Sequence, residues 1–209
     1  DGDADTLIVV DEKGRIIDGD RVLCICGKYL KDIGKLAEGK ITATVMSNIG
    51  LHKYLEQHGI DVDVTKVGDR YVLESMLQTG SVLGGEQSGH MIFLDYTTTG
   101  DGVLSSLQFM KAYLASGSKL SELRDEIHIY PQALVNAGVD NAYKQAALED
   151  EEVKEFIGKV EAKLEGTGRV LIRPSGTEPL IRVMLEGEDS EEIRGYAEQI
   201  AELIHKKFG

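Results

Sequence analysis

The sequence predicts an α/β unit followed by a smaller α+β unit, and three observations carry this prediction. Short runs of β-branched and apolar residues alternate with amphipathic helical stretches of about 10–15 residues through the first half of the chain. Two strand-like runs follow one another in the last third, between two helical stretches. A Ser-Gly-Ser segment at residues 116–118 separates the two patterns, so we expect the boundary within residues 116–126.

The strands of the first unit are expected where apolar and β-branched residues form runs of strand length. These runs cover residues 7–10, 16–17, 41–46, 61–67 and 91–94, with a turn at 11–15 between the first two. Because helical stretches separate most of them, an α/β sheet with mainly crossover connections is expected.

The helices of the first unit are expected where apolar residues recur at helical spacing. Asp20 is expected to cap the first helix and Ser47 the second, because their side-chain oxygens can accept from free backbone N–H groups. Gly59 and Gly80 are expected to end the second and third helices. The last helix is predicted as amphipathic from four apolar residues, Val103, Leu107, Met110 and Leu114.

The second unit is expected to place two helices on one face of a small antiparallel sheet. Its strands are predicted at 127–139, with a bend at Pro131, and at 169–172 and 180–184. One helix is predicted from the apolar stripe between Val153 and Leu164. The last helix is expected to begin at Asp189, where Glu192 completes a pattern that resembles a capping box.

Charge and composition exclude several classes of protein. With 36 acidic and 23 basic residues the formal charge is −13, which disfavours a general nucleic-acid partner. Apolar runs are too short for a membrane span, and the first residues resemble neither a signal nor a transit peptide. The two cysteines, Cys24 and Cys26, form no disulfide framework or zinc cluster, so we expect small core residues and a reduced, cytoplasmic setting.

The first loop that can carry chemistry is the acidic segment at the start of the chain. Asp1, Asp3 and Asp5 alternate, so an extended backbone would direct all three carboxylates to one side, where they suit Mg²⁺ or Ca²⁺. A solvated acidic terminus is the alternative. An EF-hand is disfavoured because Thr6 stands where that loop needs Gly and a strand-like run follows.

The second loop is the glycine-rich segment at residues 84–90, between two short strands. Glu86, Ser88 and His90 combine acceptors and donors, which is the mixture that adjacent sugar hydroxyls need. An ordinary glycine-rich turn is the alternative, and His90 fits a structural role equally well.

The third loop, at residues 173–179, predicts a phosphate site. Two guanidinium groups and two hydroxyl groups surround a glycine that lets backbone N–H groups form an anion nest. It is not a Walker loop, and a polar turn whose arginines pair with carboxylates is the alternative. The predicted phosphate-binding residues are Arg173, Ser175, Gly176, Thr177 and Arg182.

These three loops, in this order, resemble the α-D-phosphohexomutase superfamily, with its DGDxDR metal loop, GExSGH sugar loop and RxSGTEP phosphate loop. The wider stretches at 45–51, 67–72, 85–90 and 173–184 resemble the bacterial phosphoglucosamine mutases of that superfamily. The resemblance implies a four-domain enzyme. Residues 1–17 would be the tail of its second domain, 18–118 its sugar-binding third domain with a mixed sheet, and 127–209 its phosphate-binding fourth domain.

The resemblance implies interconversion of glucosamine 6-phosphate and glucosamine 1-phosphate through a phosphoserine and a bisphosphate intermediate. That serine belongs to the first of the missing N-terminal domains, so the sequence offers no catalytic nucleophile and we expect this fragment to be inactive alone. Mg²⁺ would be held by Asp1, Asp3 and Asp5, and a hexosamine phosphate would be the substrate. Asp69 and Arg70 are candidate cleft residues.

One position departs from the family pattern. Thr6 follows the third aspartate where the family has arginine, so it supplies no guanidinium for phosphate or proton transfer. Thr6 and the absent nucleophile leave open a noncatalytic sugar-phosphate binding module. A mutase acting on phosphomannose or phosphoglucose is a separate alternative, which the Glu-Gln-Ser form of the second loop disfavours by resemblance.

Overall fold

The computed structural model describes residues 2–209 and divides into two compact units between Ile129 and Tyr130. The sequence placed this boundary earlier, within residues 116–126. In the structure that stretch forms helix α5 (Leu120–Glu126), and Leu120, Leu123 and Ile127 pack into the core of the first unit. Burial of these apolar side chains attaches α5 to the first unit.

The first unit is built on a four-stranded sheet in the order β4-β3-β5-β6. Strand β3 lies between β4 and β5 and pairs in parallel with both. Strands β5 and β6 pair antiparallel, so the sheet is mixed as predicted. A short 3-10 turn, η1 (Ala37–Gly39), leads into the central strand. The strands are β3 (Lys40–Thr44), β4 (Asp61–Thr65), β5 (Leu83–Gly85) and β6 (Met91–Phe93).

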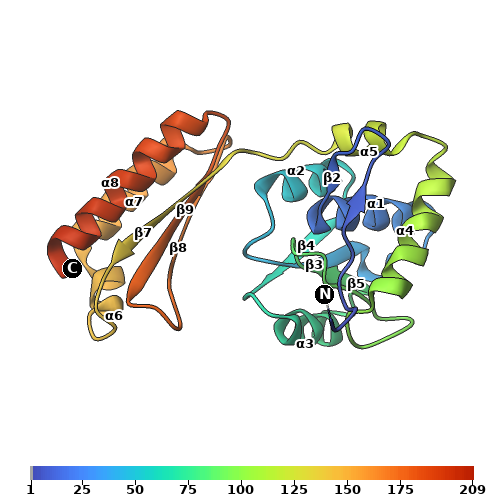
Figure 1. The fold of residues 1–209 in the computed structure, drawn as a ribbon, viewed down its shortest axis with the longest axis horizontal. Coiled ribbons are helices and arrows are strands. Elements are labelled where there is room, and N and C mark those ends of the chain that lie inside the picture. Colours follow the sequence, from blue (N-terminus) through green and yellow to red (C-terminus); the bar gives the residue numbers. More distant parts are fainter. Residues whose placement is uncertain (1) are drawn as a thin grey trace. The chain divides into compact units, whose positions relative to one another are not determined.

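Helices cover both faces of this sheet and make a three-layer unit (Figure 1). Side chains of α1 (Gly19–Asp32), α2 (Ile49–Gln57) and α4 (Gly102–Ser116) share the main core, in which Cys24 and Cys26 are buried as expected. Helix α3 (Asp69–Thr79) packs Val72 and Met76 against Ile92 on the opposite face and ends at Gly80, as predicted.

Two of the predicted helix caps are wrong by one or two residues. Asp18 caps α1 by accepting from the backbone N–H of Arg21, whereas Asp20 lies inside the first turn and is fully buried. Asn48 rather than Ser47 caps α2. Any of these side chains can cap a helix, and the tertiary contacts of the neighbouring residue select which one does.

The apolar residues that predicted α4 do not form its packed face. Val103, Leu107, Met110 and Leu114 are 68%, 58%, 49% and 69% exposed. The helix instead buries Phe109 and Ala112, together with small and polar side chains that let it lie close to α1. The helical period was correct, but a period does not identify which side of a helix meets its neighbour.

Residues 9–17 of the first unit contain a two-stranded ribbon. Strands β1 (Val9–Val10) and β2 (Ile16–Ile17) pair antiparallel around the predicted turn. In this turn Arg15 bridges Asp11 and Asp125, with Nε and Nη1 each 2.8 Å from a carboxylate oxygen.

The second unit contains the antiparallel sheet β7-β9-β8, with α7 and α8 on one face, as predicted (Figure 1). The sequence missed a short helix, α6, and the first strand begins only after Pro131, which has no N–H to donate. The elements are β7 (Gln132–Gly138), α6 (Lys144–Glu149), α7 (Glu151–Lys163), β8 (Arg169–Pro174), β9 (Leu180–Glu186) and α8 (Ser190–Phe208), the last capped by Asp189 as expected. No helix in residues 2–209 has both the length and the apolar character needed to cross a membrane.

Candidate functional site

The glycine-rich loop joins β5 to β6 as a tight turn. The backbone N–H of Glu86 donates to the carbonyl of His90 at 3.0 Å, and that of Gly89 donates to the carbonyl of Glu86 at 3.0 Å. A Cβ atom at Gly84 would lie 2.6 Å from the sulfur of Met76, and one at Gly85 would lie 2.6 Å from the carbonyl of His90. Packing under the loop therefore requires both glycines.

Glu86 and Ser88 border a hollow at the carboxyl ends of the parallel strands. Oε1 of Glu86 accepts from the backbone N–H of Gly68 at 3.0 Å, which fixes the side chain at the start of α3. Within residues 2–209 no donor bonds to Oε2 of Glu86, so this oxygen can accept a ligand hydroxyl. The hollow has a volume of about 280 Å³ and is lined by Thr44, Met46, Val67, Glu86, Gln87 and Ser88.

His90 is buried and does not line this hollow. Its Nε2 accepts from the backbone N–H of Gly100 at 3.2 Å, and its Nδ1 lies 3.3 Å from Oδ2 of Asp5. Both ring nitrogens therefore face groups within the chain, and the direct contact of His90 with a sugar stays a prediction. In the structure His90 lies beside Asp5.

The acidic segment is not extended, contrary to the argument from alternating side chains. Gly2 and Asp3 lie in a turn, and Ala4 has a φ of 56°, in the left-handed region. The direction of Asp5 comes instead from its contact with His90. Asp1 lies outside the described residues.

The hydrogen bonding of the Asp5 carboxylate tests whether a cation fits the acidic segment. Its Oδ1 is buried and has no hydrogen-bond partner, as expected for a carboxylate oxygen placed for a cation. Residues 2–209 contain no group of three potential ligands placed to hold a metal. Binding of a hard cation by Asp3 and Asp5 therefore stays a prediction, and it would need ligands in addition to these two carboxylates.

The structure brings the acidic segment and the glycine-rich loop together. Thr6 forms an antiparallel bridge with His90, and the backbone N–H of Leu7 donates to the carbonyl of Gly89 at 2.9 Å. Two loops separated by about eighty positions of the sequence thus adjoin through the backbone. Asp5 and Glu86 therefore belong to two segments of the first unit that adjoin each other.

The second unit places its two predicted arginines side by side. Arg173 on β8 lies directly opposite Arg182 on β9. The next pair, the partly buried Ile172 and the buried Val183, lies on the helix-covered face. The guanidinium groups therefore occupy the helix-free face of the sheet. One of them, that of Arg182, contacts the carboxylate of Glu178 at 2.8 Å.

The loop between Arg173 and Arg182 is held by Lys144, a residue that the sequence did not predict for the site. The ammonium group of Lys144, on α6, is buried and donates to the carbonyls of Ser175 and Glu178 at 2.6 and 2.5 Å. The hydroxyl of Ser175 accepts from the backbone N–H of Glu178 at 3.1 Å. An isolated lysine in a short helical stretch gave no signal, because only the tertiary fold brings it under the loop.

Gly176 and Thr177 form the exposed tip of this loop. The φ of Gly176 lies outside the left-handed region, and an added Cβ atom would meet no atom within 4 Å. The chain itself therefore does not require glycine here. Open space beside the backbone is what an approaching oxyanion needs.

Asp69 and Arg70, the candidate cleft residues, begin α3. Both are exposed, and Arg70 pairs with Glu74 with its Nε 2.8 Å from Oε1. Hydrogen bonding to Glu74 raises the pKa of Arg70. Neither residue lines the hollow beside Glu86, whereas their neighbour Val67 does.

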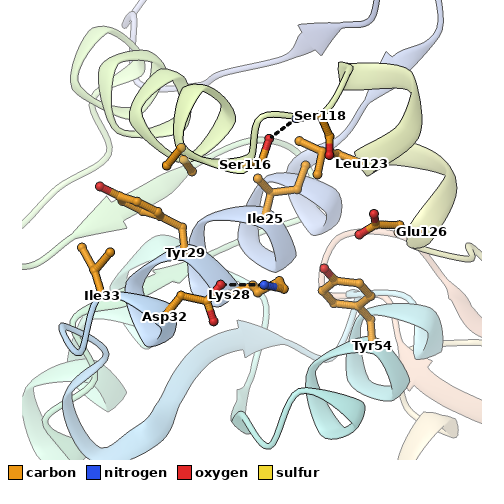
Figure 2. Close-up of a pocket in the computed structure, with 12 residues that line it drawn as sticks. Ile25, Lys28, Tyr29, Asp32, Ile33, Tyr54, Ser116, Ser118, Leu123 and Glu126 are labelled. Atoms are coloured by element: carbon orange, nitrogen blue, oxygen red, sulfur yellow. Dashed lines mark hydrogen bonds and ion pairs between the residues drawn. The ribbon is translucent and has the colours of Figure 1, made fainter.

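A second hollow, of about 300 Å³, lies among the helices of the first unit (Figure 2). Tyr29 and Tyr54 flank it, with Glu126 across from Tyr54, and Lys28 bonds to Asp32 at its edge. None of the residues predicted for a site lines it.

Comparison with known proteins places this geometry in a family. The model of the phosphoglucomutase/phosphomannomutase alpha/beta/alpha domain III matches residues 18–130, and the model of the C-terminal domain matches residues 134–203. The chain belongs to the phosphoglucomutase/phosphomannomutase family. The predicted resemblance and fold class are thereby confirmed.

Similar sequences within the family are phosphoglucosamine mutases. The enzyme of Streptococcus gordonii is 53% identical over 209 residues, which cover 100% of this chain and 46% of that protein. The enzyme of Caldanaerobacter subterraneus is 56% identical over 208 residues, again with 100% and 46% coverage. The chain spans about half the length of these relatives and matches their C-terminal portion.

Solved structures of the family share the fold at low identity. N-acetylphosphoglucosamine mutase of Aspergillus fumigatus superposes with a TM-score of 0.80 and 20% identity, covering 98% of this chain and 47% of that one. A structure of the Aspergillus fumigatus enzyme in complex with GlcNAc-6P and magnesium gives a TM-score of 0.76 at 20% identity and 98% and 51% coverage. This likeness shows a common architecture across both units.

Proposed function

We propose that this chain is the C-terminal part of a phosphoglucosamine mutase, an enzyme that interconverts glucosamine 6-phosphate and glucosamine 1-phosphate. The observation that carries the proposal is identity above 50% along the whole chain to phosphoglucosamine mutases, with the three loops in order. Because the chain spans 46% of these relatives, the complete activity requires residues beyond it. The transferring phosphoserine is the group we expect there.

Each unit by itself offers groups that suit a part of a hexosamine phosphate. Glu86 and Ser88 border the hollow, where a free carboxylate oxygen and a hydroxyl suit ring hydroxyls of a sugar. Arg173 and Arg182, with the exposed loop tip at 176–177, suit the phosphate that is not reacting. Guanidinium groups and backbone amides bind phosphate oxygens whichever end of the sugar carries them.

Asp3 and Asp5, together with Asp1, would hold Mg²⁺. The unpartnered oxygen of Asp5 supports this assignment, and His90 keeps that carboxylate in place. A bound Mg²⁺ supplies positive charge that stabilises developing negative charge on a phosphoryl group.

A complementation experiment tests the proposal. The chain alone, given glucosamine 6-phosphate and a hexose bisphosphate, should show no isomerisation. A chimera that joins it to the N-terminal portion of the Streptococcus gordonii enzyme should isomerise glucosamine 6-phosphate faster than mannose or glucose phosphates. An inactive but folded chimera would contradict the proposal, and robust turnover by the chain alone would contradict its dependence on other domains.

Thr6 favours a second candidate function, a noncatalytic module that binds sugar phosphates. It stands where the loop pattern has arginine, and it contributes a backbone bridge to His90 but no guanidinium. In that case the chimera should bind glucosamine 6-phosphate without turnover, and Thr6→Arg should restore activity. Turnover by the chimera with Thr6 unchanged would exclude this candidate.

A further inference from the structure

Asp20 is a buried carboxylate that none of the roles above uses. It lies in the first turn of α1 and is completely shielded from solvent. Its Oδ2 accepts from the backbone N–H of Asn48 at 2.8 Å and from Nε2 of Gln87 at 3.2 Å. One carboxylate oxygen thus joins the start of α1, the loop before α2 and the glycine-rich loop.

Gly19, the residue before Asp20, contacts the glycine-rich loop through its backbone. The N–H of Gly19 donates to the carbonyl of Gln87 at 3.0 Å. A Cβ atom on Gly19 would lie 2.8 Å from that carbonyl and 2.8 Å from the nitrogen of Gly89, so only glycine allows this approach. Gln87 is therefore held at two points, its carbonyl by Gly19 and its side-chain amide by Asp20.

Keeping a carboxyl group in this place is unfavourable by itself. Burial raises the pKa of Asp20 to about 7, although the hydrogen bonds from Asn48 and Gln87 oppose the shift. Apolar side chains fill such positions without this desolvation cost. The two hydrogen bonds that Asp20 accepts offset this desolvation cost. An apolar replacement would leave the N–H of Asn48 and the amide of Gln87 without their acceptor.

Gln87 lies between the two side chains assigned to the sugar. We propose that Asp20 is a positioning residue that braces the glycine-rich loop through Gln87 and so holds Glu86 and Ser88 in their binding geometry. The sugar part of this inference rests on the proposed function. Gln87 then acts as an internal brace, with its amide nitrogen committed to Asp20 rather than to a ligand.

An isosteric pair of substitutions in the 209-residue chain tests the brace. At a pH above about 8, where Asp20 is ionised, Gln87→Glu sets two carboxylates against each other, so the backbone amides of Glu86 and Gly89 should exchange hydrogen about tenfold faster. Affinity for glucosamine 6-phosphate should fall about tenfold. Adding Asp20→Asn should restore both to within about twofold, because an asparagine amide can donate to the new carboxylate. Asp20→Asn alone should stay near wild type, since its oxygen can accept both existing bonds.

A control separates the brace from the general stability of α1. Asp18→Ala removes the cap of this helix without touching the loop, so it should leave exchange at Glu86 and Gly89 unchanged. Unchanged exchange and affinity in Gln87→Glu, or no recovery with Asp20→Asn, would overturn the inference. Exchange without ligand reports on the brace even if wild type does not bind glucosamine 6-phosphate, in which case only the proposed function fails.

Discussion

Arg173 lies directly opposite Arg182 in the pairing of β8 with β9, so two guanidinium groups occupy neighbouring places on one face of the sheet. Like charges in directly opposed positions of a sheet are destabilising. Glu178 pairs with Arg182 at the exposed surface, and no carboxylate within residues 2–209 forms an ion pair with Arg173. A phosphate placed between the two arginines would relieve their repulsion.

Arg173→Ala should therefore weaken phosphate binding without destabilising the fold. Loss of a charge-assisted hydrogen bond predicts a loss of about 1.5–3 kcal/mol in binding free energy for glucosamine 6-phosphate. Removing one of two like charges should leave the free energy of unfolding unchanged or slightly higher. Calorimetric titration and urea unfolding measure the two quantities. Arg194→Ala, at an exposed position on α8, is the matched control, and equal affinities in the two variants would remove the phosphate assignment.

Lys144→Met should make the loop at residues 173–179 less stable. The carbonyls of Ser175 and Glu178 would lose a buried cationic donor, which predicts a destabilisation of about 1–3 kcal/mol. Amide hydrogen exchange across residues 175–178 should also accelerate. Lys154→Met, on the exposed surface of α7, should change neither quantity. If both methionine variants behave alike, Lys144 does not support the loop.

Asp20 should make the stability of the chain depend on pH between about 4 and 7. Its folded pKa, about 7, exceeds the ordinary value of 3.8 because of burial. The folded state therefore binds more protons, and the stability that this group contributes is lost as pH rises through 7. Asp125, whose pKa is lowered by its bond with Arg15, acts in the opposite direction and at lower pH. Urea unfolding between pH 5 and 8 should show a fall in wild type that Asp20→Asn removes, and parallel profiles would contradict this prediction.

The two sides of α4 should respond oppositely to truncation. Phe109→Ala removes a buried ring and should cost about 3–5 kcal/mol of unfolding free energy. Leu107→Ala alters a side chain that is 58% exposed and should change the stability of this chain by less than about 0.5 kcal/mol. Thermal unfolding of both variants checks this. A large cost for Leu107→Ala would mean that the exposed apolar stripe packs against something in solution.

The sequence by itself determined most of the helices and strands and the residue types of the three loops, but not the short helices α5 and α6. The periods of strands and helices, and helix ends at glycines such as Gly80, depend on the backbone preferences of residues that are close together in the sequence. The residue types in the loops likewise identified carboxylate, hydroxyl and guanidinium chemistry before any contact was known. These features are local, and local information is enough to predict them.

Only the tertiary structure decided which side chains meet. Leu107 is exposed, Asp18 rather than Asp20 caps the first helix, and His90 is buried with its Nδ1 beside Asp5, all because of long-range packing. It also brought Lys144 beneath the phosphate loop and Asp20 against Gln87. Such partners lie tens of positions apart, and their contacts depend on how whole layers pack, which spacing along the chain does not encode.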